Sequence, residues 1–424
     1  MKIEQACRFR ANDGYRLVAQ SSGVGHTEEH ALELFSDVMG GLLGEPSSKA
    51  VSCLMRGNVV VTARATGLSD AYGRRAVFAH GVFIKRPDYV EALENDPLGT
   101  LAWLYAKACS STNTTGDLPV LEYDEETPTV CCRDVRERAG LDDDTAYATY
   151  LKEVVRAILF GGAVCLDDMQ GDSERLLPRV ACAAYGLPKR LQLALTWSSA
   201  FDTRAAICVA GAERVGTGRL THFSAQDYSQ DVMAGSIQDE IGPFMAVAQM
   251  GDEERRTYLD RVDGWMSSVL PGVSLPNMQI LLCAMCLARC EELDGAEKAR
   301  LLEMLLGLLA EPAVETDVIE RTLVDVLQTT GEREVLPTEL LGRLARYATQ
   351  HPRPELTDAV LARVDSGDSD ACRAVLSSLL DQACSSSDSQ PIVARLVERL
   401  GKDNNTSLFA DQELGEKALL WYAR

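Results

Sequence analysis

The sequence predicts an α+β fold, with a mixed α/β N-terminal half followed by an all-α helical C-terminal region that is solenoid-like in its spacing. Two observations lead to this class. Strand and helix signals alternate over roughly the first 235 residues, and the strand signal then disappears. Beyond that point helical segments recur about every 20 residues, so helix pairs recur at about 40, near the period of helical-repeat proteins. No repeat consensus is present, which leaves an irregular helical bundle as the alternative.

Length and composition indicate a globular protein of several domains. The chain has 424 residues, and its hydrophobic fraction of 46% and charged fraction of 25% are those of ordinary soluble proteins. A small polar stretch at 110–117 has no periodicity and marks a linker. We therefore expect three domains: an N-terminal α+β domain over 1–112, a middle α/β domain over 118–235 and an all-α helical domain over 236–424.

The N-terminal domain begins with a predicted β-hairpin. Asp13-Gly14 is a strong hairpin signal and lies between two strand-like segments. A helix is expected to begin near Thr27, a natural N-cap residue that two glutamates follow, and to run to about Leu43. A second helical segment starts at Pro87 and closes the domain. Strands are expected at 50–55, 59–65 and 76–84.

The middle domain shows the same alternation of strands and helices. Aspartates at 142–144 precede a helical pattern that ends at a glycine pair, which suits the helix dipole and a glycine stop. The apolar run AVCL at 163–166 predicts a buried strand, and a helix is expected over 172–185. Alternating leucines in RLQLALTW, 190–197, predict another strand, and AAICVAG, 205–211, predicts the last one.

The C-terminal region consists of predicted helices separated by turn residues. In one of them Ile319, Leu323, Val326 and Leu327 form a single helical stripe, which is typical of a helix that faces a core. The expected helices cover 237–250, 252–269, 276–293, 296–310, 316–329, 337–349, 355–364, 369–383, 391–400 and 411–423. An acidic helical array of this kind suits contacts with other proteins.

The formal charge of −21 limits the classes of partner. Such an acidic surface repels phosphate backbones and anionic lipid headgroups, so nucleic acid and membrane surfaces are not expected as main partners, and basic protein patches are favoured. The first residues lack the apolar core of a secretory signal, and no apolar run is long enough to span a bilayer. We expect no membrane insertion and a cytoplasmic location. The 13 cysteines, mostly within apolar patterns, indicate buried, reduced thiols.

The segment HTEEH at 26–30 has the H-x-x-E-H order of the inverted zinc peptidases. In a zinc site both imidazoles project from one helical face, because four residues make about one turn. With Thr27 as the N-cap, His26 would lie before the helix and His30 inside it, so the two rings would not share a face. Helix capping is the favoured interpretation and implies no cofactor. A metal site formed by His26, Glu29 and His30 is the alternative.

Other candidate sites depend on weaker patterns. Cys283 and Cys286 form a single CxxC on an apolar helical stripe, which favours core cysteines over a zinc site. Cys131-Cys132 is a vicinal pair that would need a low thiolate pKa for a reactive role. The acidic pair 167–168 would suit magnesium, although strand termination is favoured. The sequence contains no Walker phosphate loop and no nucleophile elbow, so no catalytic residue is expected.

Several motifs follow one another in a fixed order over about residues 1–230. The hairpin ACRFRANDGYRLVAQSSGV is followed by a helix and then by GRRAVFAHGVFI, which contains Phe78, Ala79 and His80. Farther on, AVCLDD is followed by a helix and by YGLPKRLQLALTWSSAFD. In this order the motifs resemble the N-terminal domain and the middle region of the bacterial GTPase-associated protein family. Here Trp197 stands where a phenylalanine is more usual.

The resemblance implies an adaptor, since members are predicted partners of small or effector-like GTPases in bacterial conflict or defence systems. It carries over no catalytic residue. The candidate contact residues are Tyr15, Arg16, Arg74, Arg75 and His80. For each there is a plainer interpretation, because a strand histidine is more often a core residue and an arginine pair more often a solvated turn.

The leading interpretation is a non-enzymatic interaction protein with a protein partner, which the resemblance suggests is a GTPase. Two alternatives remain. One is a metal-dependent hydrolase that uses the HTEEH segment, and the other is a helical-repeat scaffold beside which the N-terminal unit folds.

Overall fold

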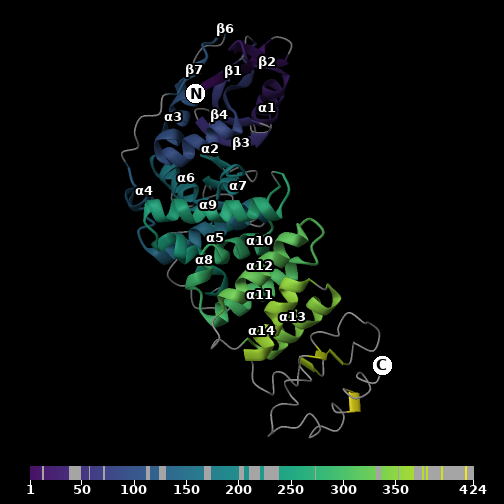
Figure 1. Ribbon diagram of the computed structural model, residues 1–424. Helices are drawn as coiled ribbons and strands as arrows, with labels where there is room; N and C mark the ends of the chain where they lie inside the picture. Colours follow the sequence, from purple (N-terminus) through teal and green to yellow (C-terminus); the bar gives the residue numbers. More distant parts are fainter. Residues whose placement is uncertain are drawn as a thin grey trace. The chain divides into compact units, whose positions relative to one another are not determined.

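The structure is a computed structural model, and its chain divides into two compact units, Met1–Asp260 and Arg261–Arg424. The described residues are 1–11, 14–37, 49–56, 58–69, 72–110, 115–123, 130–166, 173–199, 205–209, 220–223, 238–272, 274–330, 336–351 and 353–366, with the short pieces 375–376, 379–380, 393–394 and 416–417. Over these residues the first unit contains a mixed sheet with helices and the second is helical (Figure 1). The predicted α+β fold followed by an all-α region is confirmed.

The described strands of the first unit belong to one sheet of 11 strands. They are β1 (Lys2–Ala11), β2 (Gly14–Gln20), β3 (Lys49–Arg56), β4 (Asn58–Ser69), β5 (Arg75–Ile84), β6 (Gly116–Asp117), β7 (Leu121–Glu122), β8 (Ala163–Leu166), β9 (Trp197–Ser198), β10 (Ile207–Val209) and β11 (Leu220–Phe223). Their order is β11-β8-β10-β9-β3-β4-β5-β1-β2-β6, and β7 pairs with β1. The strands from β11 to β9 pair in parallel, and those from β9 to β2 pair antiparallel.

The pairing of β9 with β3 joins the two halves of the sheet, with Ser198 opposite Ser52. The hydroxyl groups of these two buried serines also lie 2.8 Å apart. The ranges expected to form separate N-terminal and middle domains therefore share one sheet. The unit built on that sheet also includes the beginning of the range 236–424, as far as Asp260.

Local patterns explain the antiparallel half of the sheet. The strands expected at 50–55, 59–65 and 76–84 appear as β3, β4 and β5. The expected hairpin appears as β1 paired with β2, with Ala11 opposite Gly14. Gly14 has a φ of +128°, a conformation that glycine adopts without steric cost, while Asp13 lies outside the described residues.

Helices cover both faces of the antiparallel strands. They include α1 (His26–Asp37), α2 (Arg86–Asn95) and α3 (Pro97–Ser110). Leu32 of α1 belongs to the same buried cluster as Ala79 of β5. The next side chain of β5, His80, points to the opposite face, because side chains alternate along a strand. There its Nδ1 lies 2.9 Å from the Ala108 carbonyl oxygen of α3.

The second half of the unit differs from expectation at RLQLALTW. The helices here are α4 (Cys132–Ala139), α5 (Asp144–Phe160), α6 (Ser173–Gly186), α7 (Lys189–Gln192), α8 (Gln238–Gln249) and α9 (Asp252–Val269), which crosses the unit boundary. The predicted strand at 190–197 is wrong, because Pro188 starts the short helix α7, and only Trp197 and Ser198 are extended. Leu191 and Leu195 are nevertheless fully buried. They lie four residues apart, so the apolar pattern belongs to a helical turn that packs in the core. Strand β11 was not predicted.

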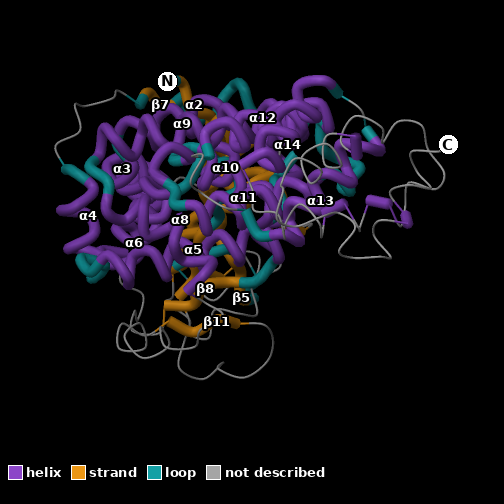
Figure 2. The backbone as a smooth tube through the Cα atoms, turned by 60° about the horizontal axis from the view of Figure 1, so that its bottom comes forward, coloured by secondary structure: helices purple, strands orange, loops and turns teal. Residues whose placement is uncertain are grey.

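The second unit consists of a series of amphipathic helices, and no strand occurs among its described residues (Figure 2). After the end of α9 these are α10 (Met278–Leu287), a 3₁₀ turn (Cys290–Glu292), α11 (Gly295–Leu308), α12 (Thr316–Thr329), α13 (Thr338–Gln350) and α14 (Pro354–Ser366). The stripe of α12 is buried as predicted. The helices expected at 369–383, 391–400 and 411–423 lie largely outside the described residues.

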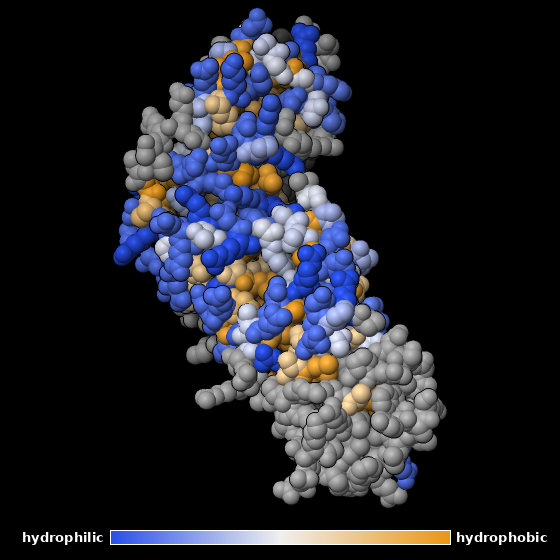
Figure 3. Space-filling view, viewed as in Figure 1, coloured by the Kyte–Doolittle hydropathy of each residue, from blue (hydrophilic) through white to orange (hydrophobic). Residues whose placement is uncertain are grey.

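The surface is rich in polar residues, as the charged fraction of 25% leads us to expect. The face drawn in Figure 3 is largely hydrophilic, with smaller apolar groups between the polar ones. Among the residues that the structure describes, no helix combines the length and the apolar character needed to cross a membrane.

Candidate functional site

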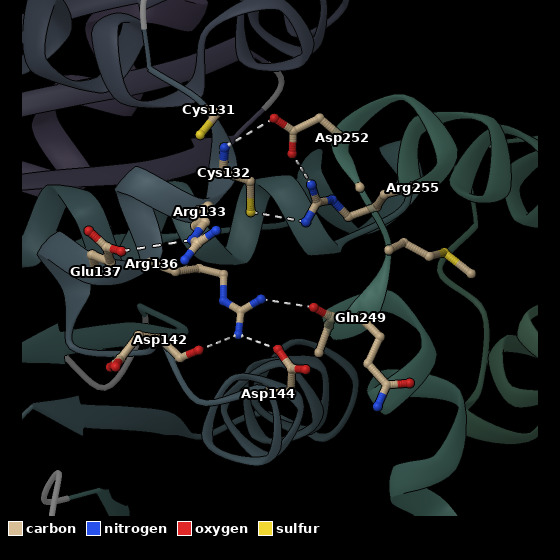
Figure 4. A pocket seen from close by; sticks show the side chains of 13 residues that line it. Cys131, Cys132, Arg133, Arg136, Glu137, Asp142, Asp144, Gln249, Asp252 and Arg255 are labelled. Atoms are coloured by element: carbon tan, nitrogen blue, oxygen red, sulfur yellow. Dashed lines mark hydrogen bonds and ion pairs between the residues drawn. The ribbon is translucent and has the colours of Figure 1, made fainter.

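A pocket of about 570 Å³ opens in the first unit where four helices meet (Figure 4). The start of α4 and the residues leading into α5 form one side, and the end of α8 and the start of α9 form the other. Charged and sulfur-bearing side chains line it, among them Cys131, Cys132, Arg136, Asp144, Asp252 and Arg255. What the pocket can do chemically depends on which of these groups the protein already uses.

Arg136 is a buried cation whose three guanidinium nitrogens all donate hydrogen bonds. Its Nε donates to the Leu141 carbonyl oxygen at 2.9 Å, and one Nη donates to the Ala248 carbonyl oxygen at 2.8 Å. The second Nη donates to the Asp142 carbonyl oxygen at 3.0 Å and to the Asp144 carboxylate at 2.7 Å. A buried charge is tolerated where it is paired and bonded in this way. Arg136 therefore ties α4 to the end of α8 and the start of α5.

Arg255 forms a second buried connection on α9. One Nη donates to the Cys132 sulfur at 3.0 Å, and the other donates to the Asp252 carboxylate. The second oxygen of that carboxylate accepts the Cys132 backbone N–H at 3.2 Å. Asp252 also lies in the first turn of α9, where the helix dipole favours a negative charge. These three residues hold the starts of α4 and α9 together.

The thiol in this pocket is not activated. Burial raises the pKa of Cys132 above its usual value, and the nearby Arg255 guanidinium lowers it by less. Since the thiolate is the nucleophilic form, a buried thiol with a raised pKa is a poor nucleophile at neutral pH. We name Arg136, Arg255, Asp252 and Cys132 the helix clamp, because the last three are bonded to one another and Arg136 is bonded to backbone carbonyls of α8 and of the segment between α4 and α5.

The sequence drew attention to Cys131 and Cys132, but the other residues of the helix clamp were missed. Arg136 lies within the amphipathic pattern of α4, next to the buried Val135, and this was the one local signal of its burial. Its partner Ala248 is 112 residues away and contributes only a carbonyl oxygen. Such a partner leaves no side-chain pattern for sequence analysis to find.

Two of the predicted contact residues, Tyr15 and Arg16, are neighbours on β2. The Tyr15 ring centroid lies 5.5 Å from the guanidinium carbon of Arg8 and 5.9 Å from that of Arg10. The Tyr15 hydroxyl accepts the Val77 backbone N–H at 3.1 Å. Arg16 is exposed and points to the opposite face of the sheet, because side chains alternate along the strand.

Arg74 and Arg75 lie at the start of β5. Arg74 is exposed, and its guanidinium carbon lies 5.1 Å from the ring centroid of Tyr72, which is itself 66% exposed. The backbone of Arg75 begins β5, and its side chain lies outside the described residues. Arg74 is three residues from Val77, so its backbone is within about 11 Å of the Val77 N–H that Tyr15 binds.

His80 does not join these residues at the surface. It is 1% exposed, with Nδ1 directed at the Ala108 carbonyl oxygen and Nε2 2.9 Å from the Gln5 side-chain amide. The structure thus brings Tyr15 and Arg74 to the same end of the antiparallel strands and places His80 in the core between β5 and α3.

The helix start in HTEEH differs from expectation. Helix α1 begins at His26, and the Glu29 N–H donates to the Gly25 carbonyl oxygen at 3.0 Å, so Gly25 takes the capping position assigned to Thr27. The prediction that His26 lies outside the helix is wrong. The exposed rings of His26 and His30 have centroids 6.4 Å apart, and His30 Nδ1 lies 3.5 Å from the Glu33 carboxylate.

The remaining cysteines and acids do not gather into a metal centre in the part of the chain that the structure describes. No group of three or more His, Cys, Asp or Glu side chains there has an arrangement that could hold a metal ion. Burial raises the pKa of Cys283, and it raises the pKa of Cys286 to about 11. The acidic pair 167–168 lies outside the described residues.

Comparison of the chain with protein-family models, with curated proteins and with solved structures finds no match.

Proposed function

We propose that this chain is a non-enzymatic interaction protein, an adaptor in a bacterial GTPase-centred conflict or defence system. The observation that carries the proposal is a group of arginine and tyrosine residues at one end of the antiparallel strands. We name it the hairpin edge. It consists of Arg10 and Tyr15 on one face of the hairpin, Arg16 on the other face, and Tyr72 and Arg74 just before β5.

The composition of the hairpin edge supports a protein partner. Tyrosine and arginine are enriched among the residues that dominate binding energy at protein interfaces. Here Tyr72 and Arg74 are exposed, while Tyr15 is held in place by its hydrogen bond to Val77. A rigid aromatic side chain loses little conformational entropy on binding, so this edge is preorganised for contact.

Charge narrows the class of partner further. The whole chain has a formal charge of −21, so its general field disfavours other strongly acidic molecules. A group of arginines at one edge provides a local exception, where carboxylates of a partner can bind in a bidentate manner. The motifs around the hairpin and GRRAVFAHGVFI supply the remaining step, since they resemble those of proteins associated with GTPases.

The helix clamp has a supporting role in this proposal. Its arginines are bonded within the protein and connect α4, α5, α8 and α9. They keep the helices in a fixed arrangement and leave contact with the partner to exposed residues.

The test uses the purified full-length chain and the GTPase encoded nearest to its gene. Binding is measured by isothermal titration with the GTPase loaded with GDP or with a non-hydrolysable GTP analogue. We expect binding in at least one nucleotide state, weakened about tenfold or more by Arg16→Glu combined with Arg74→Glu, which corresponds to about 1.4 kcal/mol.

The matched control is Arg156→Glu, which reverses an exposed arginine of α5 in the same unit. It changes the net charge in the same sense at a place outside the hairpin edge. An absence of binding in both nucleotide states, or an equal loss per reversed charge in the control, would contradict the proposed function.

A further inference from the structure

A second group of arginines occupies one stripe of α13 in the helical unit. Arg343, Arg346, Tyr347 and Gln350 recur at i, i+3, i+4 and i+7, so they share one face of the helix. Together with Leu306 of α11 they line a pocket of about 350 Å³. We name this pocket the α13 groove.

Within the described residues, the two arginines of the α13 groove have donor groups that no other group of the protein uses. In this part of the chain, Arg343 is exposed and makes no hydrogen bond or ion pair. Among the same residues, Arg346 donates only its Nε, at 3.3 Å, to the Gly342 carbonyl oxygen of its own helix. By contrast, Arg353 binds the carboxylates of Asp317 and Glu320.

Tyr347 gives the groove a fixed wall. Its hydroxyl donates to the Glu320 carboxylate at 2.7 Å, and its ring stacks on His351 with centroids 4.5 Å apart. Leu306 adds an apolar contact on the side of α11. The groove thus combines two available guanidinium groups with an ordered aromatic ring and an aliphatic side chain.

We propose that the α13 groove binds a short acidic peptide segment of a partner protein. Guanidinium groups pair best with carboxylates, and positions i and i+3 are about 4.5 Å apart along the helix axis, which suits two carboxylates about one turn apart. An apolar side chain between those carboxylates would lie against Leu306 and Tyr347. The site is separate from the hairpin edge, and the proposal does not depend on the function suggested for that edge.

Charge complementarity selects this occupant. A nucleic acid would bring many phosphates against a chain of charge −21, and the repulsion would extend well beyond the groove. A short peptide confines its negative charge to the two arginines. It also provides the aliphatic side chain for which the groove has a contact.

The test titrates the full-length protein into a fluorescein-labelled synthetic peptide of about 12 residues, in which two glutamates about one helical turn apart flank a leucine and the other residues are uncharged. Anisotropy is followed at roughly 50 mM and roughly 300 mM salt, because ion pairs at a surface weaken as salt increases. We expect saturable binding at low salt, at least tenfold weaker with Arg343→Glu combined with Arg346→Glu. A peptide with glutamine at every glutamate position should bind at least tenfold more weakly.

The matched control is Arg321→Glu on α12. Arg321 is also exposed and donates its Nε to its own helix, at the Asp317 carbonyl oxygen, but it does not line the groove. We expect it to change the affinity less than twofold. An unchanged far-ultraviolet circular dichroism melting curve shows that each variant is folded.

Three results would overturn the proposal. They are no binding of the glutamate peptide, equal binding of the glutamine peptide, or an equal loss with Arg321→Glu. A fourth result would come from analytical ultracentrifugation of the protein alone. If the wild type is a dimer and the groove variant a monomer, the occupant is a second copy of the chain and the acidic-peptide proposal is wrong.

Discussion

Arginines play opposite parts in the helix clamp of the first unit and the α13 groove of the second. Arg136 and Arg255 are 8% and 3% exposed, and their guanidinium groups are bonded to carbonyl oxygens, a thiol and carboxylates of the protein. Arg343 is exposed and makes no such bond among the described residues, and Arg346 makes one. The same residue type therefore stabilises helix packing in one place and is available to a ligand in the other.

The difference lies in hydrogen-bond saturation, by which we mean that the donor groups of an arginine already have acceptors within the protein. A saturated arginine stabilises helix packing and an unsaturated one is available to a ligand, whether or not the pocket around it is charged. The larger pocket, lined by the helix clamp, has more charged groups, yet its buried cations already have partners. Removing such a cation leaves acceptors without a donor, which costs stability. Removing an unused cation costs little stability and affects only binding.

The largest effect is expected for Arg136→Met, which keeps an unbranched, partly aliphatic side chain and removes the guanidinium group with its charge. Three backbone carbonyls and the Asp144 carboxylate lose a donor, so the free energy of unfolding should fall by about 3–5 kcal/mol. Urea unfolding followed by circular dichroism measures the change. Arg133→Met is the matched control on the same helix, because that side chain is 87% exposed, and it should change stability by less than about 0.5 kcal/mol.

Lys298→Met sharpens the comparison within the second unit. Lys298 of α11 is 5% exposed, and its Nζ donates to the Thr329 carbonyl oxygen at 3.1 Å. Its loss should lower the free energy of unfolding by about 1–3 kcal/mol, although it lies in the unit that contains the unused arginines. An effect as small as that of an exposed lysine would show that saturation is the wrong criterion.

A smaller loss of unfolding free energy is expected at alkaline pH, because the buried Cys53 thiol resists ionisation in the folded chain. Burial raises the pKa of Cys53 to about 12 from its ordinary 9.0, and its bond to Tyr89 lowers the pKa by less. The protonated thiol stabilises the fold below pH 9, and this contribution is lost as pH rises from 9 towards 12, because the unfolded chain ionises first.

The share of Cys53 in this loss is about 1.4 kcal/mol at pH 10, one unit above its ordinary pKa. Cys53→Ala should therefore reduce, by about that amount, the decline in unfolding free energy between pH 8 and pH 10. Equal slopes for wild type and Cys53→Ala would refute the assignment.

Arg343→Met should have the smallest effect on stability, below about 0.5 kcal/mol, since no bond of the described structure is lost. The measurement is the same urea titration used for Arg136→Met. A loss above about 1 kcal/mol would mean that Arg343 belongs to the packing of α13 and not to a binding surface.

Sequence analysis was most successful where structure depends on neighbouring residues. Strands β3 to β5 were placed from their local sequence and their antiparallel pairing confirms them, and α12 follows from its buried stripe. RLQLALTW misled because a short apolar run fits both a strand and a helical turn, and Pro188 determines the outcome. The start of α1 was displaced because Gly25, with the Glu28 carboxylate accepting its N–H at 3.1 Å, serves as well as Thr27.

The sites were harder to predict than the elements. Tyr15 and Arg16 stand out as polar residues of the predicted hairpin and Arg74 as one of an arginine pair, and the hydrogen bond from Val77 to Tyr15 places Tyr15 and Arg74 at the same end of the antiparallel strands. The α13 groove was missed because Arg343 and Arg346 look like any solvated helix face until the bonds of their neighbours are known. Whether the donors of an arginine are saturated depends on acceptors that are distant in sequence, so it can be seen only in the folded chain.

Selective ¹⁵N labelling of arginine tests the central claim most directly, because it reports the bonded and the unused guanidinium groups in one experiment. The Nε–Hε signals are assigned with single Arg→Lys variants and followed while the glutamate peptide is added. We predict that the signals of Arg343 and Arg346 shift and saturate together, while those of Arg136 and Arg255 stay in place. Shifts at the helix clamp with none at the α13 groove would contradict the account.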